Sequence, residues 1–187
     1  MKVRWLSTVS TLVALSAVAR LVLPFPNMKP NAVLAILGGI LLGGPAGFFT
    51  GAMGMLISDF YLGAGYWTIG TSGFMGLIGA IGGYLWHGRA SRIPRAELAV
   101  GGFLLTLIFD IGTSIWVIPI IFPEAPLVLY MASAFLGLFF PVIVGQIPYP
   151  FGLVHELTTA VLLSSVTPSV VRHFRELTRF EVHGTER

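Results

Sequence analysis

Residues 32–62 read AVLAILGGILLGGPAGFFTGAMGMLISDFYL, an apolar stretch in which Asp59 is the single charged side chain. The break Gly43-Gly44-Pro45 divides it into two runs, Ala32 to Leu42 and Ala46 to Leu62, because proline disrupts a helix interior and glycine favours a turn. A helix needs about 20 apolar residues to cross about 30 Å of hydrocarbon. We therefore expect two membrane helices joined by a tight turn, of which the first is short.

The remainder of the chain is equally apolar. Of its 187 residues, 55% are hydrophobic and 10% are charged, with a mean hydropathy of +0.87, whereas a soluble domain is about 25% charged. Further apolar runs are Trp5 to Leu23, Ile69 to Trp86, Leu98 to Ile121, Leu127 to Val144 and Phe151 to Val171. The composition predicts an all-α membrane protein. Cysteine is absent, which excludes disulfides, thiolate metal sites and cysteine nucleophiles.

Lysine and arginine are concentrated at three places. Apart from Arg20 and Lys29, they lie near the N-terminus, in one short loop and in the tail: Lys2, Arg4, Arg89, Arg92, Arg95, Arg172, Arg175, Arg179 and Arg187. Cytoplasmic segments of membrane proteins carry such positive charge, so the net charge of +3 indicates topology and not nucleic-acid binding. We expect a transmembrane domain over residues 1–171 and a basic cytoplasmic tail over residues 172–187. The protein would be multi-pass in the cell membrane, with both termini in the cytoplasm.

If the three basic places share one side, the chain crosses an even number of times between them. Four runs precede Arg89, the first of which we expect to be a retained helix and not a cleaved signal peptide. Three runs lie between Arg95 and Arg172, so one of them does not cross. We choose Leu127 to Val144, flanked by prolines, as a re-entrant or outer-leaflet helix. The prediction is a six-transmembrane-helix bundle with a short second helix and this extra helix between helices five and six.

Small residues are spaced for close helix packing. Gly47-x-x-x-Gly51 and Gly79-x-x-x-Gly83 let helix backbones approach each other, which predicts packing within the bundle. On the first helix, Ser10, Ala14 and Ala17 belong to a stripe of small residues at helical spacing. This stripe is either a docking face for a partner or an internal packing face.

Five ionisable side chains fall in or near the spans on the predicted outer half: Arg20, Asp59, Asp110, His155 and Glu156. A charge at the bilayer centre costs about 2.5 to 3.5 kcal/mol on insertion scales, so each needs a partner or a purpose. Their origin in four spans predicts a pocket open to the outside. Alternatively, Arg20 and Asp59 pair with each other, and Asp110 bonds to a hydroxyl of Thr113 or Ser114. The histidines lack metal-ligand spacing, and we predict no metal, cofactor or catalytic residue.

Aromatic side chains gather at the same level, among them Trp67 and Trp116. They would form an interfacial belt or stack on a planar ligand. Trp67 follows the glycine-rich segment Gly63-Ala64-Gly65 and is the stronger ligand candidate.

Four stretches in order resemble a known family: Arg20 to Asn31 (RLVLPFPNMKPN), Ala32 to Gly65, Tyr66 to Met75 (YWTIGTSGFM) and Gln146 to Thr159 (QIPYPFGLVHELTT). The chain is similar to the substrate-binding S component of energy-coupling-factor (ECF) vitamin transporters. The stretch Pro-Phe-x-x-x-His that ends at His155 looks most like the branch that includes cobalamin carriers.

The resemblance implies six helices, capture of a vitamin from outside, and delivery with a membrane coupling subunit and two ATPase subunits. The loop Pro24 to Asn31 would cover the pocket as a lid. Asn27 and Lys29 of this loop would then bind substrate together with Asp59, Trp67, Asp110, Trp116, His155 and Glu156. The family's Ala-x-x-x-Ala docking motif has its nearest equivalent in Ser10-x-x-x-Ala14. No Walker A pattern occurs in the chain, as expected for a subunit that depends on partner ATPases.

The predicted function is therefore capture of a small, polar, partly planar metabolite, without catalysis. Two alternatives stay open. One is a structural or assembly protein whose polar residues only pair internally. The other is an intramembrane enzyme that uses Asp110, His155 and Glu156. The sequence does not identify the vitamin or the coupling subunits.

Overall fold

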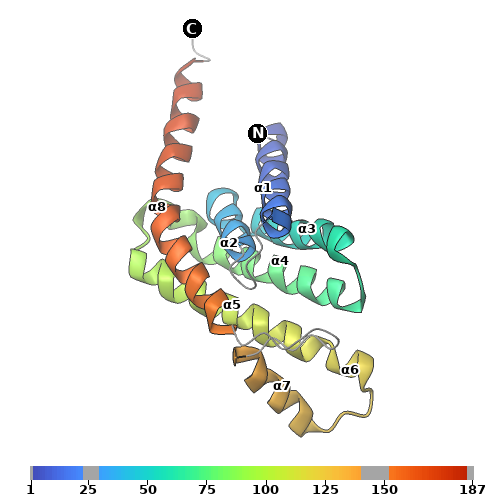
Figure 1. Ribbon diagram of the computed structural model, residues 1–187. Helices are drawn as coiled ribbons and strands as arrows, with labels where there is room; N and C mark the ends of the chain where they lie inside the picture. The colour runs from blue at the N-terminus through green and yellow to red at the C-terminus, as the bar shows by residue number, and fades with distance from the viewer. Residues whose placement is uncertain (1, 23–29, 140–151, 185–187) are drawn as a thin grey trace.

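The computed structural model describes residues 2–22, 30–139 and 152–184, and this part of the chain is helical with no strand. The helices are α1 (Lys2–Val22), α2 (Asn31–Leu42), α3 (Gly44–Leu62), α4 (Tyr66–Trp86), the 3-10 helix η1 (His87–Arg92), α5 (Arg95–Trp116), α6 (Ile118–Ile121), α7 (Leu127–Phe139) and α8 (Gly152–Gly184). Figure 1 shows them in sequence order. The all-α prediction is confirmed.

The predicted break between the second and third apolar runs is confirmed. Helix α2 ends at Leu42 and α3 begins at Gly44, so Gly43 alone connects them. Gly43 has a φ of 95°, a conformation that side chains with a Cβ rarely adopt. Pro45 lies in the first turn of α3, where its missing N–H leaves no helical hydrogen bond unmade. This turn reverses the chain and lets α2 pack against α3.

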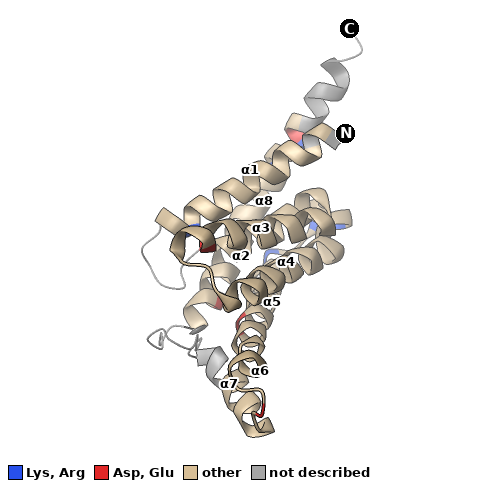
Figure 2. Ribbon diagram, turned by 90° about the vertical axis from the view of Figure 1, so that its right-hand side faces the viewer, with Lys and Arg blue, Asp and Glu red and all other residues tan. Residues whose placement is uncertain are grey.

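Three helical segments of the described residues are long and apolar enough to cross a membrane: Trp5–Val22, Tyr66–Arg92 and Arg95–Ile121. Helix α2 is apolar but, at 12 residues, only about 18 Å long. Charged residues are sparse along the helices, which are mostly tan in Figure 2. The six-span arrangement stays a prediction.

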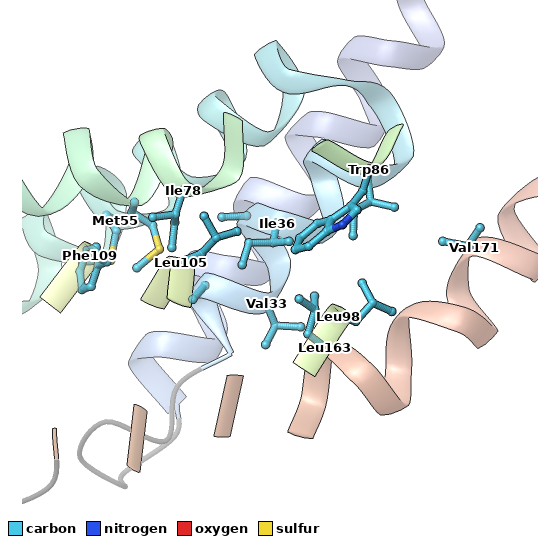
Figure 3. Close-up of a cluster of buried hydrophobic side chains, with 14 residues drawn as sticks. Val33, Ile36, Met55, Ile78, Trp86, Leu98, Leu105, Phe109, Leu163 and Val171 are labelled. Carbon is cyan, nitrogen blue, oxygen red and sulfur yellow. The ribbon is translucent and has the colours of Figure 1, made fainter. Parts of the chain in front are cut away.

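Helix α2 lies at the centre of the fold. Every residue from Asn31 to Ile40 is buried, because α1, α3, α4 and α8 pack around this helix. Its Val33 and Ile36 join Trp86, Leu98 and Leu163 in one cluster of buried side chains (Figure 3). A helix enclosed by protein on all sides does not need the full length of a lipid-facing span.

Glycines bring α2, α3 and α4 into backbone contact. A Cβ on Gly79 of α4 would lie 2.6 Å from the Gly47 carbonyl carbon and 3.0 Å from the Ala35 carbonyl oxygen. A Cβ on Gly47 would lie 2.9 Å from the Gly39 Cα atom. These distances are too short for real Cβ contacts, so side chains here would separate the helices.

Helix α7 packs mainly against α5 and makes fewer contacts with α8. It has 13 residues, a length of about 20 Å, which is less than the roughly 30 Å of a hydrocarbon core. The predicted apolar helix extended to Val144, but residues 140–144 lie outside the described part. Its predicted non-spanning role is therefore not tested.

Helix α8 continues well past the predicted boundary at residue 171. It has 33 residues and ends at Gly184, and in Figure 1 its C-terminal half extends beyond the other helices. The segment 172–184 of the predicted basic tail is therefore helical.

Candidate functional site

Three ionisable side chains from α5 and α8 meet inside the bundle. Asp110, His155 and Glu156 are 4%, 8% and 0% exposed. His155 Nδ1 lies 3.2 Å and 3.1 Å from the two carboxylate oxygens of Asp110 and donates to them. The ring of Phe109 packs edge-on against the imidazole at a centroid distance of 5.7 Å. The Phe109 ring and the Asp110 carboxylate together fix the orientation of the His155 ring.

The Asp110 carboxylate is not bonded to a neighbouring hydroxyl, which was one sequence-based alternative. Ser114 Oγ donates instead to the Asp110 backbone carbonyl at 2.7 Å, and Thr113 Oγ1 donates to the same oxygen at 3.2 Å. These bonds lie within α5 and leave the carboxylate free to turn toward α8. The sequence placed Asp110 and His155 at one level, and the structure makes them partners.

Glu156 differs from Asp110 in having no hydrogen bond to its carboxylate. Both of its oxygens are buried and make no hydrogen bond of normal geometry among the described residues, although Asp110 and His155 lie close to it. Leaving a buried polar group unpaired costs about 1–3 kcal/mol, and more for a charged group. Glu156 is therefore a candidate position for a bound donor.

Asn31 is a further buried polar residue, and the sequence analysis did not single it out. It is 2% exposed, its Nδ2 contacts the Met55 sulfur at 3.7 Å, and its Oδ1 has no partner in the described part of the chain. Met55 and Phe109 belong to the same buried cluster and lie at the same end of it in Figure 3. Asn31 contacts Met55 at this end, and His155 contacts Phe109. The sequence signal that could have identified Asn31 is an amide side chain at the start of an otherwise apolar helix.

Arg20 and Asp59 form an ion pair between the C-terminal ends of α1 and α3. Arg20 Nη1 also donates to Ser58 Oγ at 2.7 Å, and Thr71 Oγ1 donates to Asp59 Oδ2 at 3.2 Å. Asp59 is 1% exposed, so its charge is neutralised within the protein. Of the two alternatives for Asp59, the structure supports internal pairing.

Trp67 and Trp116 were both predicted to bind substrate, and both contact residues near the start of α4. Trp116 lies against Gly70, whose missing side chain leaves room for the indole ring, so it packs α5 onto α4. Trp67 packs edge-on against Tyr66 at a centroid distance of 5.1 Å and covers Gly65. The predicted loop residues Asn27 and Lys29 lie outside the described residues.

The predicted docking residues line an apolar groove between α1 and α3 with a volume of about 690 Å³. Ser10 and Ala14 are exposed in this groove, whereas Ala17 is 4% exposed. Helix α1 packs onto α3 through a neighbouring position, because Gly54 leaves room for Ser16. The stripe thus divides: Ser10 and Ala14 are open to a partner, and Ala17 is partly used in internal packing.

The described residues contain no group of three or more histidine and acidic side chains arranged to hold a metal ion. A family model described as "ECF-type riboflavin transporter, S component" matches residues 1–164. No curated protein and no solved structure matches the chain. The matched residues include the groove on α1 and the whole cluster of Asp110, His155 and Glu156.

Proposed function

Because the chain belongs to the family of ECF-type riboflavin transporter S components, we propose that it captures riboflavin or a related vitamin in a pocket beside Asp110, His155 and Glu156. The family consists of membrane transport subunits and not of enzymes. Glu156 carries the proposal, because it is a fully buried carboxylate without a hydrogen-bond partner in the described structure. A buried charge of this kind needs a donor, and a substrate would supply it.

The chemistry of the cluster suits a ligand rich in N–H and O–H groups. Glu156 accepts hydrogen bonds through two oxygens, and Asn31 Oδ1 accepts one more. The Asp110 carboxylate is already held by His155 and positions that ring. A vitamin such as riboflavin offers hydroxyl and imide donors on a largely planar molecule. Trp67 at the start of α4 is the proposed stacking residue, and the loop with Asn27 and Lys29 is the proposed lid.

Delivery of the substrate would require partners. We propose that the groove on α1, lined by Ser10, Ala14 and Ala17, docks on a membrane coupling subunit that two ATPase subunits drive. The groove is apolar and open, and small side chains let a partner helix approach closely. In this arrangement the docking face and the substrate cluster occupy separate helices, so one can be altered without the other.

The test is a thermal unfolding screen of the purified protein against riboflavin, cobalamin and other vitamins. A ligand that binds only the native state stabilises it by about 2.7 kcal/mol at a hundredfold excess over its dissociation constant. Cobalamin is included because of the motif that ends at His155, whereas the family model names riboflavin. We expect one vitamin to raise the unfolding temperature saturably.

The matched variants are Glu156→Gln and, as a control, Glu124→Gln, which changes an exposed carboxylate outside the helices. Losing one charge-assisted hydrogen bond costs about 1.5–3 kcal/mol, so Glu156→Gln should weaken binding roughly 10- to 100-fold. The control should bind normally. If no vitamin stabilises the protein, or if both variants bind equally well, the proposed pocket is wrong.

A further inference from the structure

The position of α1 on the rest of the bundle depends on few contacts. Of the three apolar spans in the described residues it is the least buried, since 17% of Trp5–Val22 is buried, against 56% of the apolar stretch in Tyr66–Arg92. Helix α1 packs mainly on α3 and makes fewer contacts with α2. Apolar packing alone gives a membrane helix little preference for one register, because lipid tails are as apolar as leucine. Specific polar contacts therefore decide where α1 lies on α3.

The polar contact between these helices is the ion pair at their C-terminal ends. Arg20 of α1 pairs with Asp59 of α3, and its Nη1 also donates to Ser58 Oγ at 2.7 Å. Thr71 Oγ1 of α4 donates to the other oxygen of Asp59 at 3.2 Å. The side chain of Asp59 is 2% exposed and that of Arg20 is 19% exposed. Moving α1 would leave a buried carboxylate without its cation, which is strongly unfavourable.

This ion pair lies at one end of the groove between α1 and α3. Residues that flank each partner in the sequence line the groove: Ala17, Leu21, Ile57 and Tyr61. Arg20 and Asp59 themselves do not line it. The pair therefore ties the two walls of the groove together without belonging to the surface that a partner would touch.

The contact near the N-terminal end of the groove is of a different kind. Trp5 packs edge-on against Phe49 at a centroid distance of 6.4 Å, and both rings line the groove. A slide of α1 by one residue moves it about 1.5 Å and turns it by about 100°. Aromatic rings can repack after such a slide, whereas an ion pair is separated by it. Buried polar groups fix the register of coiled-coil helices for the same reason.

We propose that the pair of Arg20 and Asp59 is a register lock, which holds α1 on α3 in the position where the groove accepts a helix of the coupling subunit. The inference rests on the docking role proposed above for this groove. Arg20 and Asp59 are positioning residues, because they act through the walls of the groove. Asp110, His155 and Glu156 lie on α5 and α8, so breaking the lock leaves the substrate cluster unaltered.

Spin labels test the lock without any partner. The chain has no cysteine, so labels at Thr11→Cys on α1 and Phe60→Cys on α3 report the distance between these helices. Both positions are exposed and outside the groove lining. Pulsed electron paramagnetic resonance on the purified full chain should give one narrow distance, and Arg20→Met should broaden or shift it. Arg89→Met is the matched control, because it removes an arginine from the ion pair with Glu97 and should keep the narrow distance.

Transport tests what the lock is for. Riboflavin binding by the purified protein is compared with uptake of radiolabelled riboflavin by cells that make each variant in place of the unaltered chain. Arg20→Met and Asp59→Asn should each lower uptake roughly tenfold, while the dissociation constant of riboflavin changes less than about twofold. Arg20→Lys keeps the positive charge and should restore much of the uptake, which a general loss of packing would not produce.

The two measurements separate the possible failures. An unchanged label distance in Arg20→Met would overturn the lock, and an altered distance with normal uptake would overturn its role in docking. Normal uptake by Ala14→Trp would place docking on another surface and would overturn that role as well. If the unaltered protein binds no riboflavin, the proposed substrate is wrong, and the label distances still decide the lock. If Arg20→Met does not fold, Asp59→Asn and Arg20→Lys carry both measurements.

Discussion

At the scale of single residues, the buried acidic side chains of the described structure divide into two that are paired, Asp59 and Asp110, and one that is not, Glu156. Asp59 forms an ion pair with Arg20 and accepts a hydrogen bond from Thr71. Glu156 is equally buried but has no such partner in the described structure. Because an isolated charge in a membrane is costly, the first arrangement serves the fold by itself. In the proposed function, a bound substrate completes the second.

The ion pair of Arg20 and Asp59 should contribute to stability as a unit. Asp59→Ala should lower the free energy of unfolding by about 3 kcal/mol, because it leaves a partly buried guanidinium without its partner. Arg20→Ala should have a similar effect, and the double variant should lose clearly less than the sum. Denaturant unfolding in detergent measures all four free energies of this cycle. Strictly additive losses would show that the two side chains do not interact.

The sequence predicted a common level for these side chains and offered Arg20 as the partner of Asp59, but it did not predict the pairing of Asp110 with His155. A helical period of 3.6 residues places Asp110 and His155 by depth, whereas the choice of neighbouring helix depends on packing between elements far apart in the chain. For the same reason the sequence could not show that Trp116, a predicted ligand-binding residue, lies against Gly70. Asn31 was overlooked because it was seen as the end of a loop and not as the buried start of α2.

At the scale of elements, the contact of α2, α3 and α4 depends on glycine. Gly39, Gly47 and Gly79 come from three helices, and their backbones touch each other. The sequence predicted close packing at Gly47 and Gly79, because each is followed four residues later by another glycine, Gly51 or Gly83. It could not show that the short helix α2 would lie between the other two, because spacing within one helix carries no information on the neighbour.

Gly79→Ala should therefore destabilise the protein by about 1–3 kcal/mol, the usual cost of overpacking. Gly73→Ala on the same helix is the matched control, since a Cβ there meets nothing within 4 Å. Alanine also favours a helix over glycine by up to about 1 kcal/mol, so the control should be neutral or slightly stabilising. Thermal unfolding of both variants is the measurement. Equal losses at the two positions would argue against backbone contact at Gly79.

At the scale of the whole molecule, two sets of contacts mark opposite ends of the bundle. Arg20 with Asp59 joins the C-terminal ends of α1 and α3, and Asp110 with His155 joins the C-terminal half of α5 to the start of α8. At the other end, His87 Nδ1 lies 2.9 Å from the Ile40 carbonyl oxygen, and Arg89 forms an ion pair with Glu97. The helices therefore alternate in direction from α1 to α5. This alternation agrees with the four crossings that the sequence predicted before Arg89.

The topology can be tested directly because the chain has no cysteine of its own. A cysteine at Glu124 should react with an impermeant thiol reagent added to intact cells, and one at Ser91 should react only after the membrane is opened. Both positions are exposed in the structure, so a difference in labelling would report sidedness and not burial. Labelling of Ser91→Cys in intact cells would contradict the assignment of the basic loop to the cytoplasm.

The separation of groove and polar cluster makes a last prediction about the assembled transporter. Ala14→Trp places an indole in the open groove on α1, where a partner helix would have to approach, and leaves Asp110, His155 and Glu156 untouched. It should abolish co-purification with the coupling subunit and vitamin uptake by cells, while vitamin binding by the isolated protein stays normal. Ala132→Trp, at an exposed position on α7, adds the same bulk elsewhere and should preserve uptake. If Ala14→Trp impaired vitamin binding but not assembly, α1 would belong to the substrate site and the docking surface would have to lie on another helix.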